Sequence, residues 1–153
     1  MLQYTDYNIS TLRPYINWLY FYFAWGLSGK PQEAKDRMRA EAEQMLDSLE
    51  TRYQTHAAVG LFEANSDGDD ILIGDVRLPM LRQQHPTREG EPNLSLADFI
   101  RPQASGVTDR IGVFATTVDL ALEHDFLTDD YQRMLAQTLA DRLAEATAEV
   151  LHM

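Results

Sequence analysis

Residues 57–76, AAVGLFEANSDGDDILIGDV, decide the fold class of this 153-residue chain. Residues 57–64 are rich in side chains that favour strands, and residues 70–76 alternate apolar with other side chains. Alternation of this kind is typical of a strand with one buried face. Asn65–Asp69, between the two segments, consists of turn-forming residues, including Gly68. The pattern therefore predicts a β-hairpin in the middle of the chain.

The segments that follow the hairpin extend the predicted sheet. Residues 77–84 are expected to form a third strand, which Pro79 restricts to an edge or a bulge because proline has no N–H for the ladder. Residues 85–92 are polar and contain two prolines, so we expect a loop, and residues 94–100 are expected to form a short helix or turn. Residues 110–117 are predicted to form another strand.

Helical periodicity appears on both sides of these strands. Apolar residues recur there every three or four positions, and candidate capping residues or prolines precede each run. The predicted helices cover residues 11–25, 31–53 and 128–150. Helices at both ends around a central run of strands predict an α+β domain rather than a βαβ repeat. We expect residues 1–10 to be a lead-in and residues 11–153 to form a single domain.

Composition excludes several classes of function. Thirteen basic and 24 acidic residues give a net charge of −11, which would repel a phosphate backbone, so we expect no nucleic-acid partner. The chain has no cysteine, and therefore no thiolate metal site or cysteine nucleophile. The most apolar stretch, residues 15–27, is too short to cross a membrane and contains Asn17. We expect no membrane contact, no signal peptide and a cytoplasmic location.

The acidic turn imitates part of a calcium loop. Asn65, Asp67 and Asp69 have the spacing of its first three ligands. However, Asp70 stands where the loop needs glycine, and Val76 stands where it needs a bidentate glutamate. We therefore favour an ordinary hairpin turn.

The histidines predict no metal site, because none of them has the short helical spacing of metal ligands. They are expected to be solvated or capping residues, and they are His56, His85, His124 and His152.

Two polar residues are candidates for a binding site. Asn17 lies within the aromatic stretch of the first predicted helix, where its amide must find either a protein partner or a ligand. Glu145 lies near the apolar stripe of the last helix. With Arg142 and Glu149 it could form an exposed ion-pair set, or it could face a cleft. Spacing alone leaves both alternatives open for each residue.

Several segments resemble, in order, the C-terminal reactivation domain of cobalamin-dependent methionine synthase. The resemblance runs from about residue 11 to residue 152, and no single motif carries it. The segments are RPYINW (13–18), WGLSGK (25–30), VGLFEAN (59–65), GDDI (68–71), LRQQ (81–84), LADFI (96–100), DRIGVFA (109–115) and ADRLAEA (140–146).

The resemblance implies a twisted antiparallel sheet flanked by helices, in agreement with the α+β prediction. It also implies that the domain binds S-adenosylmethionine and presents the methyl group to cobalt. The cobalamin would be held by a neighbouring cobalamin-binding domain, and flavodoxin or a flavoprotein reductase would supply the electron that reactivates cob(II)alamin. Such a domain acts by positioning its ligand, so we do not expect it to be a complete enzyme alone.

Residue by residue, the resemblance assigns the ligand site to Asn17 and Glu145. Asn17 stands where the family has an aspartate that contacts S-adenosylmethionine, and Glu145 matches a family glutamate at the ligand cleft. The family's Arg-x-Pro-x-Gly-Tyr segment has no counterpart here, so the chain is expected to be truncated. We therefore expect weak or absent S-adenosylmethionine binding by this chain alone.

Two further expectations follow from the resemblance. The missing segment would leave apolar helix faces uncovered, which favours a homo-oligomer. The alternative function is a degenerate, non-catalytic interaction module that docks on a corrinoid protein or a completing subunit.

Overall fold

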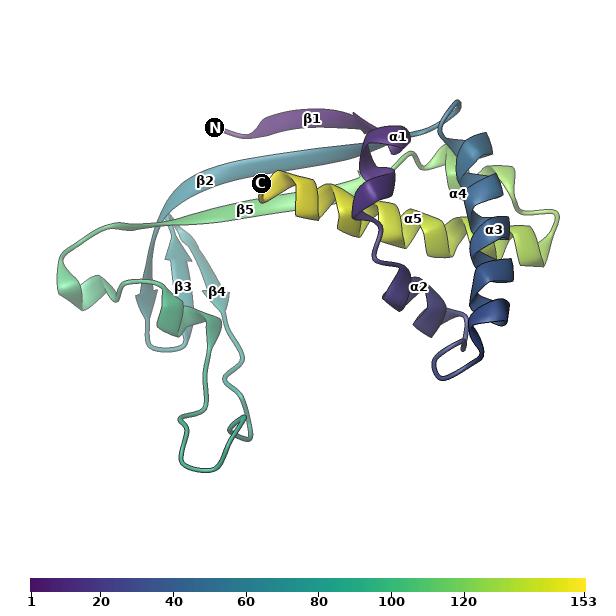
Figure 1. The fold of residues 1–153 in the computed structure, drawn as a ribbon. Coiled ribbons are helices and arrows are strands. Elements are labelled where there is room, and N and C mark those ends of the chain that lie inside the picture. Colours follow the sequence, from purple (N-terminus) through teal and green to yellow (C-terminus); the bar gives the residue numbers. More distant parts are fainter. The chain divides into compact units, whose positions relative to one another are not determined.

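The computed structural model describes residues 1–153, apart from the side chain of Glu123. The chain divides into two compact units. The first, which we call the helical unit, contains Gln3–Ala58 and Phe114–Met153, and the second, the hairpin unit, contains Met1–Leu2 and Val59–Val113. The long strands β2 (Gln54–Asp67) and β5 (Asp109–Val118) run through both (Figure 1). The fold is α+β with a mostly antiparallel sheet and flanking helices, as predicted.

The core of the helical unit forms mainly between two long helices, α3 and α5. The unit contains β1 (Gln3–Asn8), α1 (Ile9–Leu12), the 3-10 helix η1 (Arg13–Tyr15), α2 (Trp18–Ala24), α3 (Gln32–Leu49), α4 (Ala121–Asp125) and α5 (Asp130–Leu151). Leu135, Leu139 and Leu143 on α5 are completely or almost completely buried, together with Leu46 and Leu49 on α3. The predictions for these two helices are confirmed within a few residues.

The first predicted helix, over residues 11–25, is wrong in its boundaries. The chain is helical over α1 and η1, becomes extended at Ile16 and Asn17, and starts again as α2. The Asn17 side chain accepts hydrogen bonds from the backbone N–H groups of Leu19 and Tyr20, at 3.2 and 3.4 Å. Asparagine is among the preferred N-cap residues, so this side chain starts a new helix where aromatic periodicity suggested one continuous helix.

Residues 1–10, expected as a lead-in, contain strand β1 and the start of α1. Ile9 is completely buried in the core of the helical unit. Strand β1 itself is almost entirely exposed and polar, so it has no apolar alternation that would predict a strand.

His56 connects β1 to the residue that follows β5. Its Nδ1 lies 2.7 Å from Asp6 Oδ1, and its Nε2 lies 2.8 Å from Asp119 Oδ1. Asp119 also accepts the backbone N–H of Gln54 at 2.7 Å. The hydrogen bonds to Asp6 and Asp119 raise the pKa of His56, and the hydrogen bond from His56 lowers the pKa of Asp119. The expectation that His56 is merely solvated or capping is therefore wrong.

The hairpin unit is organised around one tight turn, at residues 67–70. Strands β2 and β3 (Asp70–Ile73) pair antiparallel up to Asp67 and Asp70, and β3 pairs with β4 (Val76–Pro79). The hairpin prediction is confirmed, whereas the third strand ends at Pro79 rather than at residue 84. Gly68 takes a positive φ of 60° in the turn, a conformation that glycine adopts without strain.

Arginine side chains neutralise the carboxylates of that turn. Arg77 binds Asp67 and Asp70, and Arg82 binds Asp69 and Asp98 at 2.6 and 2.7 Å. The hydrogen bonds from Arg82 lower the pKa of Asp98 to about 2. Because the buried core here is small, comprising Ala64, Ile71 and Ala97, these ion pairs help to fix the segment after β4. The acidic turn is thus engaged by the chain's own cations.

We predict that His56 stabilises the helical unit more in weak acid than in weak base. A raised pKa in the folded state means that its contribution is complete below about pH 6.5, the ordinary value, and is lost as pH rises through the folded value. His56→Gln should lower the free energy of unfolding by up to about 1 kcal/mol near pH 6 and by less near pH 9. Urea unfolding at both pH values measures this difference. His85→Gln, an exposed loop residue, is the control; an equal loss at both pH values would contradict the prediction.

Candidate functional site

Asn17 and Glu145 line the same cavity in the helical unit. Its volume is about 340 Å³, and its lining residues are Pro14, Tyr15, Ile16, Asn17, Glu145 and Glu149. One wall is the end of η1 with the two extended residues before α2, and the other wall is α5, against which η1 packs. The structure therefore brings together two residues that are far apart in the sequence.

Arg13 holds the first wall in place. From η1 its guanidinium reaches three carboxylates of α3 and its C-cap: Glu43 at 2.7 Å, Asp47 at 2.6 Å and Glu50 at 3.0 Å. These hydrogen bonds, the one to Asp47 first, raise the pKa of the guanidinium further. Carboxylates spaced three and four residues apart on a helix repel one another when unpaired. Arg13 removes this repulsion and ties the segment that continues into Asn17 to α3.

The oxygen and the nitrogen of the Asn17 amide have different roles. Its oxygen accepts the N–H groups of Leu19 and Tyr20, so both of its lone pairs are engaged in capping α2. The Nδ2 group remains available as a donor to a ligand in the cavity that Asn17 lines, since an amide nitrogen carries two N–H bonds. Asn17 can therefore donate to an acceptor on a ligand, but it offers no negative charge. The amide of Asn17 was expected to find either a protein partner or a ligand. It has protein partners, the N–H groups of Leu19 and Tyr20, and its position at the cavity also allows a contact with a ligand.

Glu145 both forms an ion pair and faces a cavity, the two alternatives that its spacing left open. Its Oε2 accepts a hydrogen bond from Arg142 Nη1 at 2.6 Å, and its side chain, 46% exposed, also lines the cavity. Glu149, one helical turn further along α5, lines the same cavity. Two carboxylates and one amide, with the cation Arg142 paired to the first carboxylate, favour a ligand that is positively charged and also carries a hydrogen-bond acceptor.

The aromatic residues of α2 are divided between the core and the surface. Phe21 is completely buried, and Trp18, Tyr22 and Trp25 pack against the core around it. Leu19 and Phe23 are 73% and 71% exposed. These two line an apolar cavity of about 350 Å³, together with Tyr20, Tyr22, Ser28, Gly29 and Lys35. The sequence pattern did not indicate how much apolar surface the face opposite Phe21 exposes.

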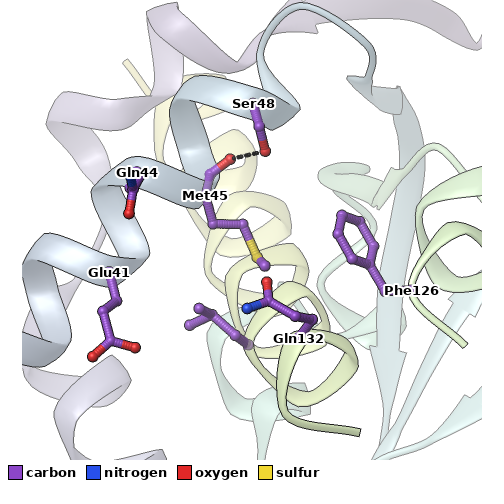
Figure 2. A pocket seen from close by; sticks show the side chains of 7 residues that line it. Glu41, Gln44, Met45, Ser48, Phe126 and Gln132 are labelled. Atoms are coloured by element: carbon purple, nitrogen blue, oxygen red, sulfur yellow. Dashed lines mark hydrogen bonds between the residues drawn. The ribbon is translucent and has the colours of Figure 1, made fainter. Parts of the chain in front are cut away.

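A further cavity, which the sequence did not suggest, lies between α3 and α5 (Figure 2). Its volume is about 300 Å³, and its lining residues are Glu41, Gln44, Met45, Ser48, Phe126, Gln132 and Leu135. Ser48 donates to the carbonyl of Met45 at 2.7 Å, as Figure 2 shows. Glu41 accepts the hydroxyl of Tyr131, which raises the pKa of Tyr131 to about 12. Because neither Asn17 nor Glu145, the two candidate site residues from the sequence, lines it, this cavity is the weaker candidate.

Two features are absent from the described residues, which leave out the side chain of Glu123. These residues contain no group of three His, Asp or Glu side chains close enough to hold a metal ion. Nor do they contain a helix with the length and apolar character that a bilayer-spanning segment needs.

Comparison with known proteins gives the family of this chain. Residues 8–153 match the family described as "Vitamin B12 dependent methionine synthase, activation domain". The chain also superimposes on the crystal structure of the MetH reactivation domain bound to AdoHcy, with a TM-score of 0.84 and 39% identity over 99% of this chain. The chain belongs to the vitamin B12 dependent methionine synthase activation domain family. It spans about half of that solved relative, 54% of its length.

We predict that Arg13 stabilises both the fold and the wall of the cavity. Arg13→Met leaves three neighbouring carboxylates without their shared cation and should lower the free energy of unfolding by about 1–2 kcal/mol. It should also speed hydrogen exchange at the amides of Leu19 and Tyr20, because the Asn17 cap loses its support. Urea unfolding and exchange followed by NMR measure the two effects.

Arg88→Met, in the loop of residues 85–92, is the matched control and should change neither quantity. Unchanged exchange at Leu19 and Tyr20 in Arg13→Met would show that Arg13 does not position this wall.

Proposed function

We propose that this chain binds S-adenosylmethionine between the η1–α2 junction and α5 and holds it for methyl transfer to cobalamin on a partner domain. One observation carries the proposal: Asn17 and Glu145 line a single cavity together with a second carboxylate, Glu149. Membership of the activation domain family supports it, as does the AdoHcy ligand named for the solved relative. The cavity volume, about 340 Å³, lies within the range of small-molecule sites.

The charges of the site suit this ligand. S-adenosylmethionine carries positive charges at its sulfonium and amino groups and a negative charge at its carboxylate. Glu145 and Glu149 stabilise the positive groups, and the free Nδ2 of Asn17 donates to an acceptor such as the carboxylate. The protein's net charge of −11 attracts a cation at long range.

The chain's contribution to the reaction is positioning. The cobalamin of the partner domain supplies the methyl-accepting metal, and flavodoxin or a flavoprotein reductase supplies the reducing electron. Arg13 and the Asn17 cap keep one wall of the cavity rigid, so the ligand is presented in one orientation. Loss of the methyl group leaves S-adenosylhomocysteine, the ligand named for the solved relative. The cytoplasmic location expected from the sequence stays a prediction.

The affinity of this chain alone is expected to be weak. The uncharged Asn17 replaces an aspartate of the family, and the lost charge-assisted contact is worth about 1–2 kcal/mol, or about tenfold in affinity. Asn17→Asp keeps a good N-cap for α2, so it can restore the charge without disturbing the helix.

We predict opposite effects of two substitutions on S-adenosylmethionine binding, measured by isothermal titration calorimetry. Asn17→Asp should tighten binding by up to about tenfold, and Glu145→Gln should weaken it by about the same factor. Glu63→Gln, which removes one charge from an exposed position on β2 outside the cavity, should leave binding unchanged. No heat of binding from the original protein or from Asn17→Asp would refute the proposed ligand.

The second candidate function is an interaction module on a corrinoid protein or a completing subunit. The exposed Leu19 and Phe23, with the apolar cavity beside them, favour this function. Capture of a corrinoid protein that does not depend on S-adenosylmethionine, together with no measurable ligand binding, would favour the module. The homo-oligomer expected from the sequence stays a prediction, which size-exclusion chromatography at several concentrations tests.

A further inference from the structure

We propose that Arg142 sets the preference of the cavity between the cationic methyl donor and its neutral demethylated product. This inference rests on the proposed function, and it concerns a residue that does not itself line the cavity. Arg142 is therefore a specificity-determining residue that acts through Glu145.

The geometry fixes a cation directly beside a carboxylate of the cavity. Arg142 Nη1 lies 2.6 Å from Glu145 Oε2, one turn earlier on α5. The Arg142 side chain is 21% exposed, less than half the exposure of its partner. Its guanidinium carbon lies 5.8 Å from the centre of the Tyr20 ring on α2. Contacts with two helices therefore restrict where this positive charge can go.

Arg142 differs from the other cations near this part of the helical unit. Arg13 is surrounded by three carboxylates of α3 and its C-cap, and Arg39 pairs with Glu43, so their charges are balanced away from the cavity. The carboxylate that balances Arg142 is one that the ligand would use. Arg142 and a cationic ligand would therefore share the same carboxylate, that of Glu145.

The two ligands differ by one unit of charge, at the sulfur atom. Both carry an amino group and a carboxylate, but only the methyl donor carries a sulfonium, so its net charge is +1 and that of the product is zero. A fixed guanidinium near the cavity disfavours the cationic ligand by Coulomb repulsion and leaves the neutral ligand almost unaffected. It also neutralises part of the attraction that Glu145 would exert. Arg142 should thus lower the ratio of donor affinity to product affinity.

This distribution of charge has a consequence for turnover. A site that bound the donor much more tightly than the product would stay occupied by the donor. Arg142 brings the two affinities closer together. Release and exchange of both species are then governed by one residue outside the direct ligand contacts.

The test measures the affinities of S-adenosylmethionine and S-adenosylhomocysteine for this 153-residue chain by calorimetry. In Arg142→Gln, the ratio of donor affinity to product affinity should rise about two- to tenfold, as expected for removal of one screened charge. The rise should shrink at high salt. Arg142→Lys keeps the charge and should stay near the original ratio.

Arg133→Gln is the matched control, because Arg133 also lies on α5 and pairs with a carboxylate three residues away, Asp130, at 2.8 Å. It should leave the ratio unchanged. A purely structural role of Arg142 predicts that both affinities fall together with the thermal midpoint, and that result would overturn the inference.

The outcomes also separate this inference from the proposed function. If the original protein binds both ligands and Arg142→Gln leaves their ratio unchanged, the role of Arg142 is overturned while the ligand site remains. If neither protein binds either ligand, both proposals are overturned. Binding of the donor by Arg142→Gln but not by the original protein would support the inference strongly.

Discussion

The ion pairs of Arg13 with Glu43, Asp47 and Glu50 are the constraint on which the candidate site depends. They fasten a short 3-10 helix to α3 immediately before the chain changes direction. Since α3 and α5 share one core, fixing η1 against α3 also fixes its distance from α5. The cavity exists because the chain stops being helical at Ile16 and Asn17, and Arg13 holds that interruption in place.

The same interruption explains why the site uses an asparagine in two ways. The oxygen of Asn17 caps α2, while its nitrogen stays available to a ligand in the cavity that Asn17 lines. An acidic residue would cap the helix as well and would also attract a cation. Arg142 makes the cavity less negative than its two carboxylates alone would, and the neutral Asn17 adds no third negative charge. Weak binding of a cationic ligand is the expected physical consequence, in a domain proposed to present its ligand to a partner.

The sequence predicted those elements that are marked by the pattern of neighbouring residues, and it missed those that depend on contacts with distant parts of the chain. Leu135, Leu139 and Leu143 recur with helical spacing, and the hairpin is marked by its turn residues, so α5, α3 and the central strands followed from pattern alone. The break before α2 could not be predicted in this way, because apolar and aromatic residues continue on both sides of Asn17. A single capping side chain does not interrupt their helical spacing. Strand β1 pairs with a distant strand and is exposed, so it has no local signal.

The site was found in part. Asn17 and Glu145 were identified through the family resemblance, but their shared cavity needed the fold. The roles of Arg13, Arg142 and His56 were missed because their partners are set by tertiary or helical contacts; the carboxylates of His56 lie 50 and 63 positions away in the chain. For Arg142 a signal was present, since the spacing to Glu145 suggested an ion pair, although that spacing did not show that the pair borders a cavity.

The most direct test of the account is to map the ligand on the protein by NMR. Isotope-labelled protein titrated with S-adenosylhomocysteine should show its largest amide shifts at residues that line the cavity, namely Tyr15, Ile16, Asn17, Glu145 and Glu149. Shifts confined to the cavity around Met45 and Phe126, or no shifts at saturating ligand, would contradict the account.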